Sequence, residues 1–149
     1  MQGKNFLNNI QLLTVRNFTS AAATGILETA VVDIANYEGV VAITQLGTTS
    51  TANGLRALIG TASASGGLSQ VLNSYVEGKS TANAIEIYRP MPGYRYVQFQ
   101  CMREASTKLG SIFVFGYGPK VAPATNDTAG LISSRVLASP ALGTASSTA

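Results

Sequence analysis

The stretch AIEIYRPMPGYRYVQFQC, from Ala84 to Cys101, contains two segments of alternating apolar and polar residues on either side of one turn. A period of two is typical of a β-strand that buries one face and leaves the other to water or to a partner. Pro90 ends the first segment, because proline cannot donate to a strand ladder. Pro92 and Gly93 predict a type II turn, since proline fixes φ near about −65° and glycine accepts a positive φ.

The same strand pattern extends over most of the chain. GILETAVVDI, VVAITQL, LRALIGT and SIFVFGY are rich in branched or aromatic residues and predict strands. GTTSTANG and ASASGGLS predict loops, and QVLNSYVEG fits either a strand or one helical turn. About eight strands at spacings of roughly 8 to 15 residues indicate an all-β fold. We expect an antiparallel β-sandwich of jelly-roll type, with an immunoglobulin-like sandwich as the alternative.

Composition divides the 149 residues into three zones around a single domain. Residues 1–23 form an N-terminal arm with one β-like stretch, residues 24–119 form the sandwich, and residues 120–149 form a C-terminal arm. Of residues 121–149, twenty are Ala, Ser, Thr, Gly or Pro, so this segment cannot build a core of its own. It nevertheless carries apolar anchors at Leu131, Ile132, Val136, Leu137 and Leu142. We expect an extended arm that binds a neighbouring subunit; the alternative is an unstructured tail.

Charged residues make up only 11% of the chain, against about 25% in typical soluble domains. Because charged residues are depleted at the centres of interfaces, this shortage favours a protein that spends much of its surface on partners. A small neutral secreted or heat-stable domain is the alternative. Ten basic and seven acidic residues give a net charge of +3 without a basic run, which speaks against a nucleic-acid partner.

The residue types needed for catalysis are scarce. The chain has no histidine, which removes Ser–His triads and most zinc sites, and we expect no enzyme, no metal and no cofactor. Its one cysteine, Cys101, excludes an internal disulfide and is expected to be a small buried hydrophobe. No stretch reaches the roughly 18 to 20 apolar residues of a membrane span, and the N-terminus does not resemble a signal peptide. We therefore expect no membrane partner.

Two groups of side chains are candidates for contact with partners. Arginine and tyrosine are enriched at interface hot spots, and five of them surround the predicted turn: Tyr88, Arg89, Tyr94, Arg95 and Tyr96. Of these we take Arg89, Tyr94, Arg95 and Tyr96 as the interface candidates. Arg103 is near Arg89 and Arg95 in the sequence, and we expect all three to be solvated or interfacial. A local corner that stiffens the sandwich is the alternative for the turn.

The second group is in SIFVFGY, where Phe113 and Phe115 alternate with apolar residues on the other face. Such a strand either lies in a sheet packed on both sides or contributes one face to a subunit contact. We expect the subunit contact.

Two short motifs resemble small structural proteins encoded in the head-gene clusters of tailed bacteriophages. The first is D-x-x-x-Y-E-G-V at Asp33–Val40, and the second is E-I-Y-R-P from Glu86, followed after a short turn by R-Y-V at Arg95–Val97. The resemblance covers roughly residues 26 to 117. It departs from the pattern at Gln98, where a second arginine is usual, and in the length of the C-terminal arm.

This resemblance implies a head decoration, or cement, protein. Such a protein is a trimer of β-sandwich subunits that binds the major capsid protein on the outer surface of the virion capsid, after assembly in the host cytoplasm. A phage neck or tail structural protein is the first alternative. A carbohydrate-binding sandwich that uses Tyr94 or Tyr96 is the second.

Overall fold

The computed structural model describes residues 6–47, 50–78 and 82–120, and almost all of the regular structure in them is β. The strands are β1 (Ile10–Arg16), β2 (Thr19–Ala23), β3 (Leu27–Glu28), β4 (Val32–Asp33), β5 (Gly39–Thr44), β6 (Ser50–Gly60), β7 (Leu68–Gln70), β8 (Val76–Gly78), β9 (Asn83–Tyr88), β10 (Tyr96–Arg103), β11 (Thr107–Leu109) and β12 (Ile112–Tyr117). Two short helical turns accompany them, α1 (Phe6–Asn9) and η1 (Ser65–Gly67).

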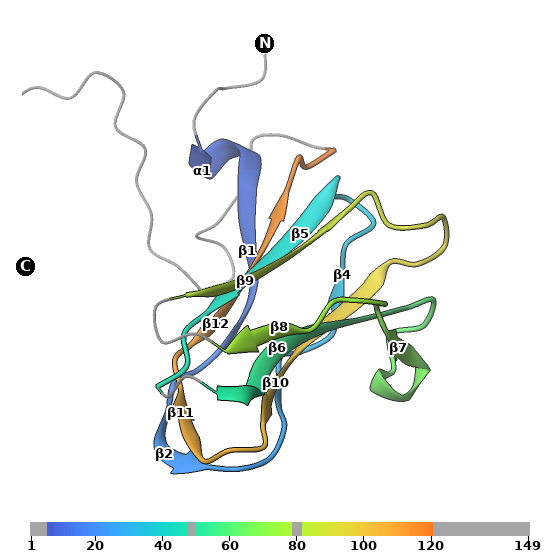
Figure 1. The fold of residues 1–149 in the computed structure, drawn as a ribbon. Helices are drawn as coiled ribbons and strands as arrows, with labels where there is room; N and C mark the ends of the chain where they lie inside the picture. The colour runs from blue at the N-terminus through green and yellow to red at the C-terminus, as the bar shows by residue number, and fades with distance from the viewer. Residues whose placement is uncertain (1–5, 48–49, 79–81, 121–149) are drawn as a thin grey trace, which may run out of the picture.

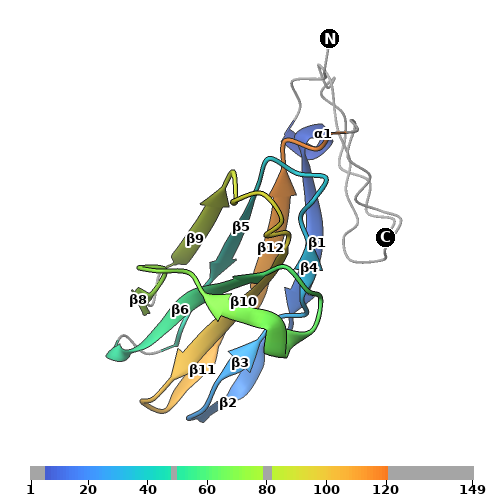
Figure 2. The same cartoon turned by 90° about the vertical axis from the view of Figure 1, so that its right-hand side faces the viewer.

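The strands form two main antiparallel sheets that lie face to face (Figures 1 and 2). One has four strands in the order β1-β12-β5-β9. The other has the order β3-β10-β6-β7, with β4 also paired to β10 and β8 also paired to β6. The short strands β2 and β11 pair separately. The expected antiparallel β-sandwich is confirmed, and its jelly-roll subtype stays a prediction.

Side chains from both sheets fill the space between them. Val40 and Val114 from the four-stranded sheet belong to the same buried cluster as Leu55 and Phe99 from the six-stranded sheet. All four are fully buried. Each such side chain contributes about 1.5 to 3 kcal/mol relative to an exposed one, so this cluster is the main stabilising feature of the fold.

The N-terminal segment pairs within its own chain. β1 is antiparallel to β12 from Ile10 opposite Tyr117 to Arg16 opposite Ile112, and forms one edge of the four-stranded sheet. β2 pairs with β11 at the far end of the sandwich. The part of the predicted arm from residue 10 to 23 is therefore built into the sandwich.

Two predicted strand boundaries are wrong. GILETAVVDI forms β3 and β4 rather than one strand, because the Thr29 hydroxyl accepts a hydrogen bond from the Phe99 N–H at 3.1 Å and takes the place of a ladder partner. GTTSTANG is not all loop, since β6 begins at Ser50, where it pairs with Gly78 of β8. QVLNSYVEG contains the last residue of β7, the turn that follows and the whole of β8. In the turn, the Ser74 N–H donates to the Val71 carbonyl.

Tyrosine rings cover two glycines of the central strands β5 and β12. Tyr117 lies directly over Gly39, its cross-strand partner, and the Tyr37 ring lies over Gly116. A Cβ at Gly39 would also lie 2.8 Å from the Ile87 carbonyl oxygen. The close approach of ring and backbone thus requires glycine at this position.

Gly39→Ala is expected to lower the free energy of unfolding by about 1 to 3 kcal/mol, because the added methyl overpacks the contact with Tyr117 and the Ile87 backbone. Urea unfolding monitored by circular dichroism would measure the change. The matched control is Gly66→Ala, which adds its methyl where no atom lies within 4 Å. Equal stability of the two variants would contradict the packing argument.

Candidate interaction surfaces

The loop between β9 and β10 connects the two sheets at one end of the sandwich. The Tyr94 N–H donates to the Met91 carbonyl at 3.0 Å, and Gly93 has φ of +88°. A hydrogen bond from the first carbonyl to the fourth N–H, with positive φ at the third residue, is typical of a type II turn. The turn type predicted from Pro92 and Gly93 is therefore confirmed. The turn and its flanking arginines are called the turn end below.

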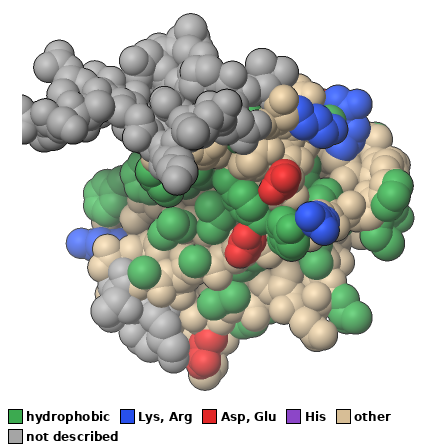
Figure 3. All heavy atoms as spheres, turned by 90° about the horizontal axis from the view of Figure 1, so that it is seen from above, with side chains coloured by type: hydrophobic (Ala, Val, Ile, Leu, Met, Phe, Trp, Pro, Cys, Tyr) green, Lys and Arg blue, Asp and Glu red, His purple; other side chains and the backbone are tan. Residues whose placement is uncertain are grey.

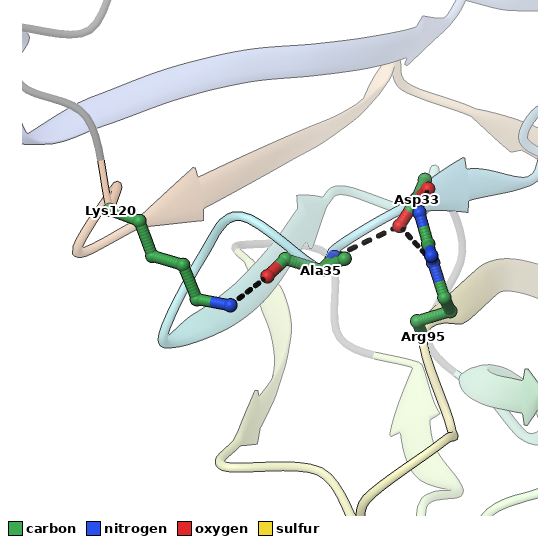
Figure 4. A network of polar contacts seen from close by, with 4 residues as sticks. All are labelled: Asp33, Ala35, Arg95 and Lys120. Carbon is green, nitrogen blue, oxygen red and sulfur yellow. Dashed lines mark hydrogen bonds and ion pairs between the residues drawn. The ribbon is translucent and has the colours of Figure 1, made fainter.

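Arg95 forms an ion pair within the chain. Its Nε donates to Asp33 Oδ1 at 2.9 Å, and a second guanidinium nitrogen pairs with Oδ2 (Figure 4). The Ala35 N–H also donates to Oδ1 at 2.9 Å. The hydrogen bond from Arg95 holds the pKa of the Asp33 carboxyl below its ordinary value. The Arg95 guanidinium additionally lies 5.3 Å from the Tyr96 ring centroid, so this arginine supports the corner, although its side chain remains 48% exposed.

Arg89 is held in an unusual backbone conformation. Its φ of +47° is in the left-handed region, which side chains other than glycine rarely adopt. The Arg89 N–H donates to the Glu38 carbonyl at 3.0 Å, which fixes the residue there. Its guanidinium lies over the exposed Tyr88 ring at 5.0 Å from the centroid. Arg89 is therefore an exposed arginine at the turn end, on a backbone conformation that favours glycine.

A cavity of about 570 Å³ separates the turn from the loop before β5. Its walls include Ile34, Tyr37, Glu38, Arg89, Tyr94 and Lys120. The Lys120 ammonium donates to the Ala35 carbonyl, and its backbone N–H donates to Asn36 at 2.8 Å, so the last described residue is fixed on the same loop (Figure 4).

The two motifs that carry the phage resemblance contact each other at this cavity. Asp33 of the first motif pairs with Arg95 of the second, and the Glu38 carbonyl accepts the Arg89 N–H. Gly39 is also the cross-strand partner of Tyr88. Segments about fifty residues apart in the sequence therefore form one structural unit.

Arg103 does not belong to the turn end, contrary to the expectation that it is solvated or interfacial. It lies at the opposite end of β10, is only 6% exposed, and donates to the backbone carbonyls of Thr24, Gly25 and Thr107 at 3.3 Å each. Buried guanidinium groups need such acceptors, and here they tie β10 to the loop after β2.

Phe113 and Phe115 point away from the core on the four-stranded sheet, with ring centroids 6.4 Å apart. Cross-strand pairing places them in rows, and we call the surface made by these rows the outer face. The rows are Ile10–Tyr117–Gly39–Tyr88, Leu12–Phe115–Val41–Glu86 and Val15–Phe113–Ile43–Ala84. Ile10 and Leu12, at the β1 edge, are buried, so the exposed apolar part lies over β12 and β5. Of these twelve positions only Glu86 is charged, and the Tyr117 hydroxyl donates to its carboxylate. A groove of about 340 Å³ runs over part of this face.

The six-stranded sheet has a polar face whose side chains are paired with one another. The Arg56 guanidinium donates to Gln100 Oε1 at 2.7 and 2.9 Å, and Gln100 donates on to Glu28. Gln98 donates to the Thr29 carbonyl. Both glutamines are buried. At these two positions the second face of β10 is therefore open neither to water nor to a partner.

Leu131, Ile132, Val136 and Leu137 lie outside the described residues. Cys101 is fully buried, which raises the pKa of its thiol to about 11 and confirms a packing role. Within residues 6–47, 50–78 and 82–120, no group of His, Cys, Asp and Glu side chains could hold a metal ion. In the same segments no helix is long and apolar enough to cross a membrane.

Sequence reasoning missed Asp33 as the partner of Arg95, and Val41 and Ile43 as members of the outer face. The apolar run VVAITQL predicted a strand without showing which face is exposed, and in the structure Ile43 is 40% exposed. On the face drawn in Figure 3, only a few Lys, Arg, Asp and Glu side chains lie among the hydrophobic side chains, the other side chains and the backbone of the described area. No family model and no curated protein matches the chain.

Asp33→Asn should make stability less dependent on acid pH. Because Arg95 holds the folded-state pKa below the ordinary value of 3.8, the carboxylate stabilises the fold above that value and loses this effect as pH falls through the lowered pKa. The difference in unfolding free energy between wild type and variant should therefore be largest near neutral pH and shrink below about pH 4. Urea unfolding across this range measures it, with the exposed Glu104→Gln as control. A difference that stays constant with pH would contradict the ion pair.

Proposed function

We propose that this chain is a virion structural protein that binds the outer surface of an assembled tailed-phage capsid as a homotrimer and stabilises the shell. The observation that carries the proposal is the contact between the two motifs of the resemblance. Glu38, Arg89 and Arg95 line the same cavity, and Asp33 is joined to it through its ion pair with Arg95, so residues of both motifs form one unit at the surface. The charge-poor exterior supports a protein that acts by adhesion.

The mechanism is thermodynamic. A protein that binds only the assembled shell stabilises it by mass action, because bound copies are lost when capsid subunits separate. A trimer presents three copies of each contact at once, and the repeated weak contacts then add through avidity. No reacting group is required on the protein.

Arg89 and Tyr94 are the side chains that we assign to capsid contact. Tyr94 is 36% exposed at the turn, and Arg89 is exposed beside Tyr88. Tyrosine provides a rigid ring and arginine a planar guanidinium group with several donors, and both residues are enriched at interface hot spots. Arg95 and Tyr96 have the supporting role, because Arg95 is paired with Asp33 and Tyr96 is partly buried.

A neck or tail protein would use similar contacts in a ring instead of a lattice. Electron microscopy of particles from a strain that produces the chain separates the two functions. Density distributed over the whole shell supports the decoration role, whereas density at one vertex supports the neck role and overturns the capsid-wide proposal.

Arg89→Gly is the sharpest test of the assigned surface. Glycine adopts φ of +47° without strain, so the variant should be at least as stable as the wild type while it lacks the guanidinium. Its affinity for purified capsids, measured by cosedimentation, should fall about tenfold or more if Arg89 is a hot spot. The control is Lys108→Ala, which removes an exposed cation from β11 at the other end of the sandwich (Figure 1). Unchanged binding by Arg89→Gly would remove Arg89 from the contact surface.

A further inference from the structure

The outer face of the four-stranded sheet exposes large apolar side chains. Phe113 is 42% exposed and Ile43 is 40% exposed, side by side in one row. The flanking Phe6 of α1 is 73% exposed. Contiguous apolar area of this kind on a monomer marks a binding site.

We propose that the C-terminal segment of the same chain, residues 121–149, binds across the outer face and pairs Arg135 with Glu86. This inference does not rest on the capsid role, because it concerns the free protein. It also differs from the expectation drawn from the sequence, which placed this arm on a neighbouring subunit.

The position of the last described residue favours this face. Lys120 follows the end of β12 by three residues and is bonded to Asn36, just before β5. β5 and β12 are the two central strands of the outer face. Ten to eleven extended residues span about 35 Å, whereas a six-residue strand is about 20 Å long, so Leu131 can reach any part of the face.

Charge complementarity selects the C-terminal segment over a second copy of the sheet. Glu86 is the one charged residue in the three rows, and residues 121–149 contain one cation, Arg135. In an extended segment Arg135 shares a side with Leu131 and Leu137, because side chains alternate with period two. Two outer faces packed together would instead bury Glu86 against a surface without a cation, which is costly.

Tethering selects the chain's own segment over that of a neighbour. A segment joined to its binding face by a short stretch of the same chain has an effective concentration in the millimolar range. A second copy at micromolar concentration cannot compete with it. The covered face would keep the free protein from associating through Phe113 and Phe115.

A disulfide test measures the proximity directly in the full chain. Glu86→Cys with Arg135→Cys should form an intramolecular disulfide at micromolar protein, at least tenfold faster than the control pair Glu104→Cys with Arg135→Cys. The native Cys101 should stay reduced because it is fully buried. Peptide mapping by mass spectrometry assigns the bond. Equal rates for both pairs overturn the docking, and a predominant disulfide between two chains overturns the assignment to the same chain.

A charge exchange tests the predicted pair without a new covalent bond. Arg135→Glu should raise the binding of an apolar fluorescent dye to the protein severalfold, since the segment no longer covers the face. Adding Glu86→Arg should return dye binding to within about twofold of wild type, with circular dichroism reporting the fold. Dye binding that does not change in the single variant, or does not recover in the double variant, contradicts the Arg135–Glu86 pair.

Discussion

β10 is paired on both edges and covered on both faces, so its backbone groups and its polar side chains must find hydrogen-bond partners inside the protein. Much of the remaining architecture follows from that constraint. One edge pairs with eight consecutive residues of β6, and the other is shared by β3 and β4. Phe99 is fully buried toward the core, and on the opposite face Gln98 and Gln100 are also buried. An unpaired amide in such a place would cost about 1 to 3 kcal/mol. The hydrogen bonds supplied by residues 28 and 29 are therefore conditions for the strand to lie where it does.

The two ends of β10 are fixed by arginines in different ways. Arg95 precedes the strand and uses a carboxylate, Asp33, in a half-exposed ion pair. Arg103 ends the strand and uses three backbone carbonyls while it is almost fully buried. A surface ion pair contributes little to stability, whereas removal of a buried, hydrogen-bonded guanidinium would leave several carbonyls without partners. The turn end is thus held by a solvent-exposed ion pair, and the opposite end by buried hydrogen bonds.

Local periodicity predicted much of this fold. It failed where contacts with residues distant in the sequence determine whether a side chain is buried. Alternation in YRYVQFQC placed Val97, Phe99 and Cys101 in the core, where all three are fully buried. Pro92 and Gly93 predicted the turn type, because both act through their own φ angles. Alternation could not show that Gln100 is buried, because its partners are residues 28 and 56. For the same reason Arg103 was indistinguishable from an exposed arginine.

The candidate surfaces also have features that the sequence predicts and features that it does not. The sequence located the turn and the outward direction of Phe113 and Phe115, which are properties of single loops and strands. It could not locate the rows of the outer face, since cross-strand register joins residues up to about a hundred positions apart, as at Ile10 and Tyr117. Nor could it separate Arg95 from Arg89, because the difference depends on Asp33.

In a chain with few charged residues, the contacts of each arginine indicate its role. Arg56, Arg95 and Arg103 all direct their guanidinium groups to acceptors within the fold. Arg89 lies instead over the Tyr88 ring at the surface, on a backbone conformation that costs an ordinary residue about 1 kcal/mol or more. Glycine would remove that cost and fit the same hydrogen bond to Glu38. The strained conformation of Arg89, where glycine would be more stable, supports the proposal that its side chain contacts a capsid.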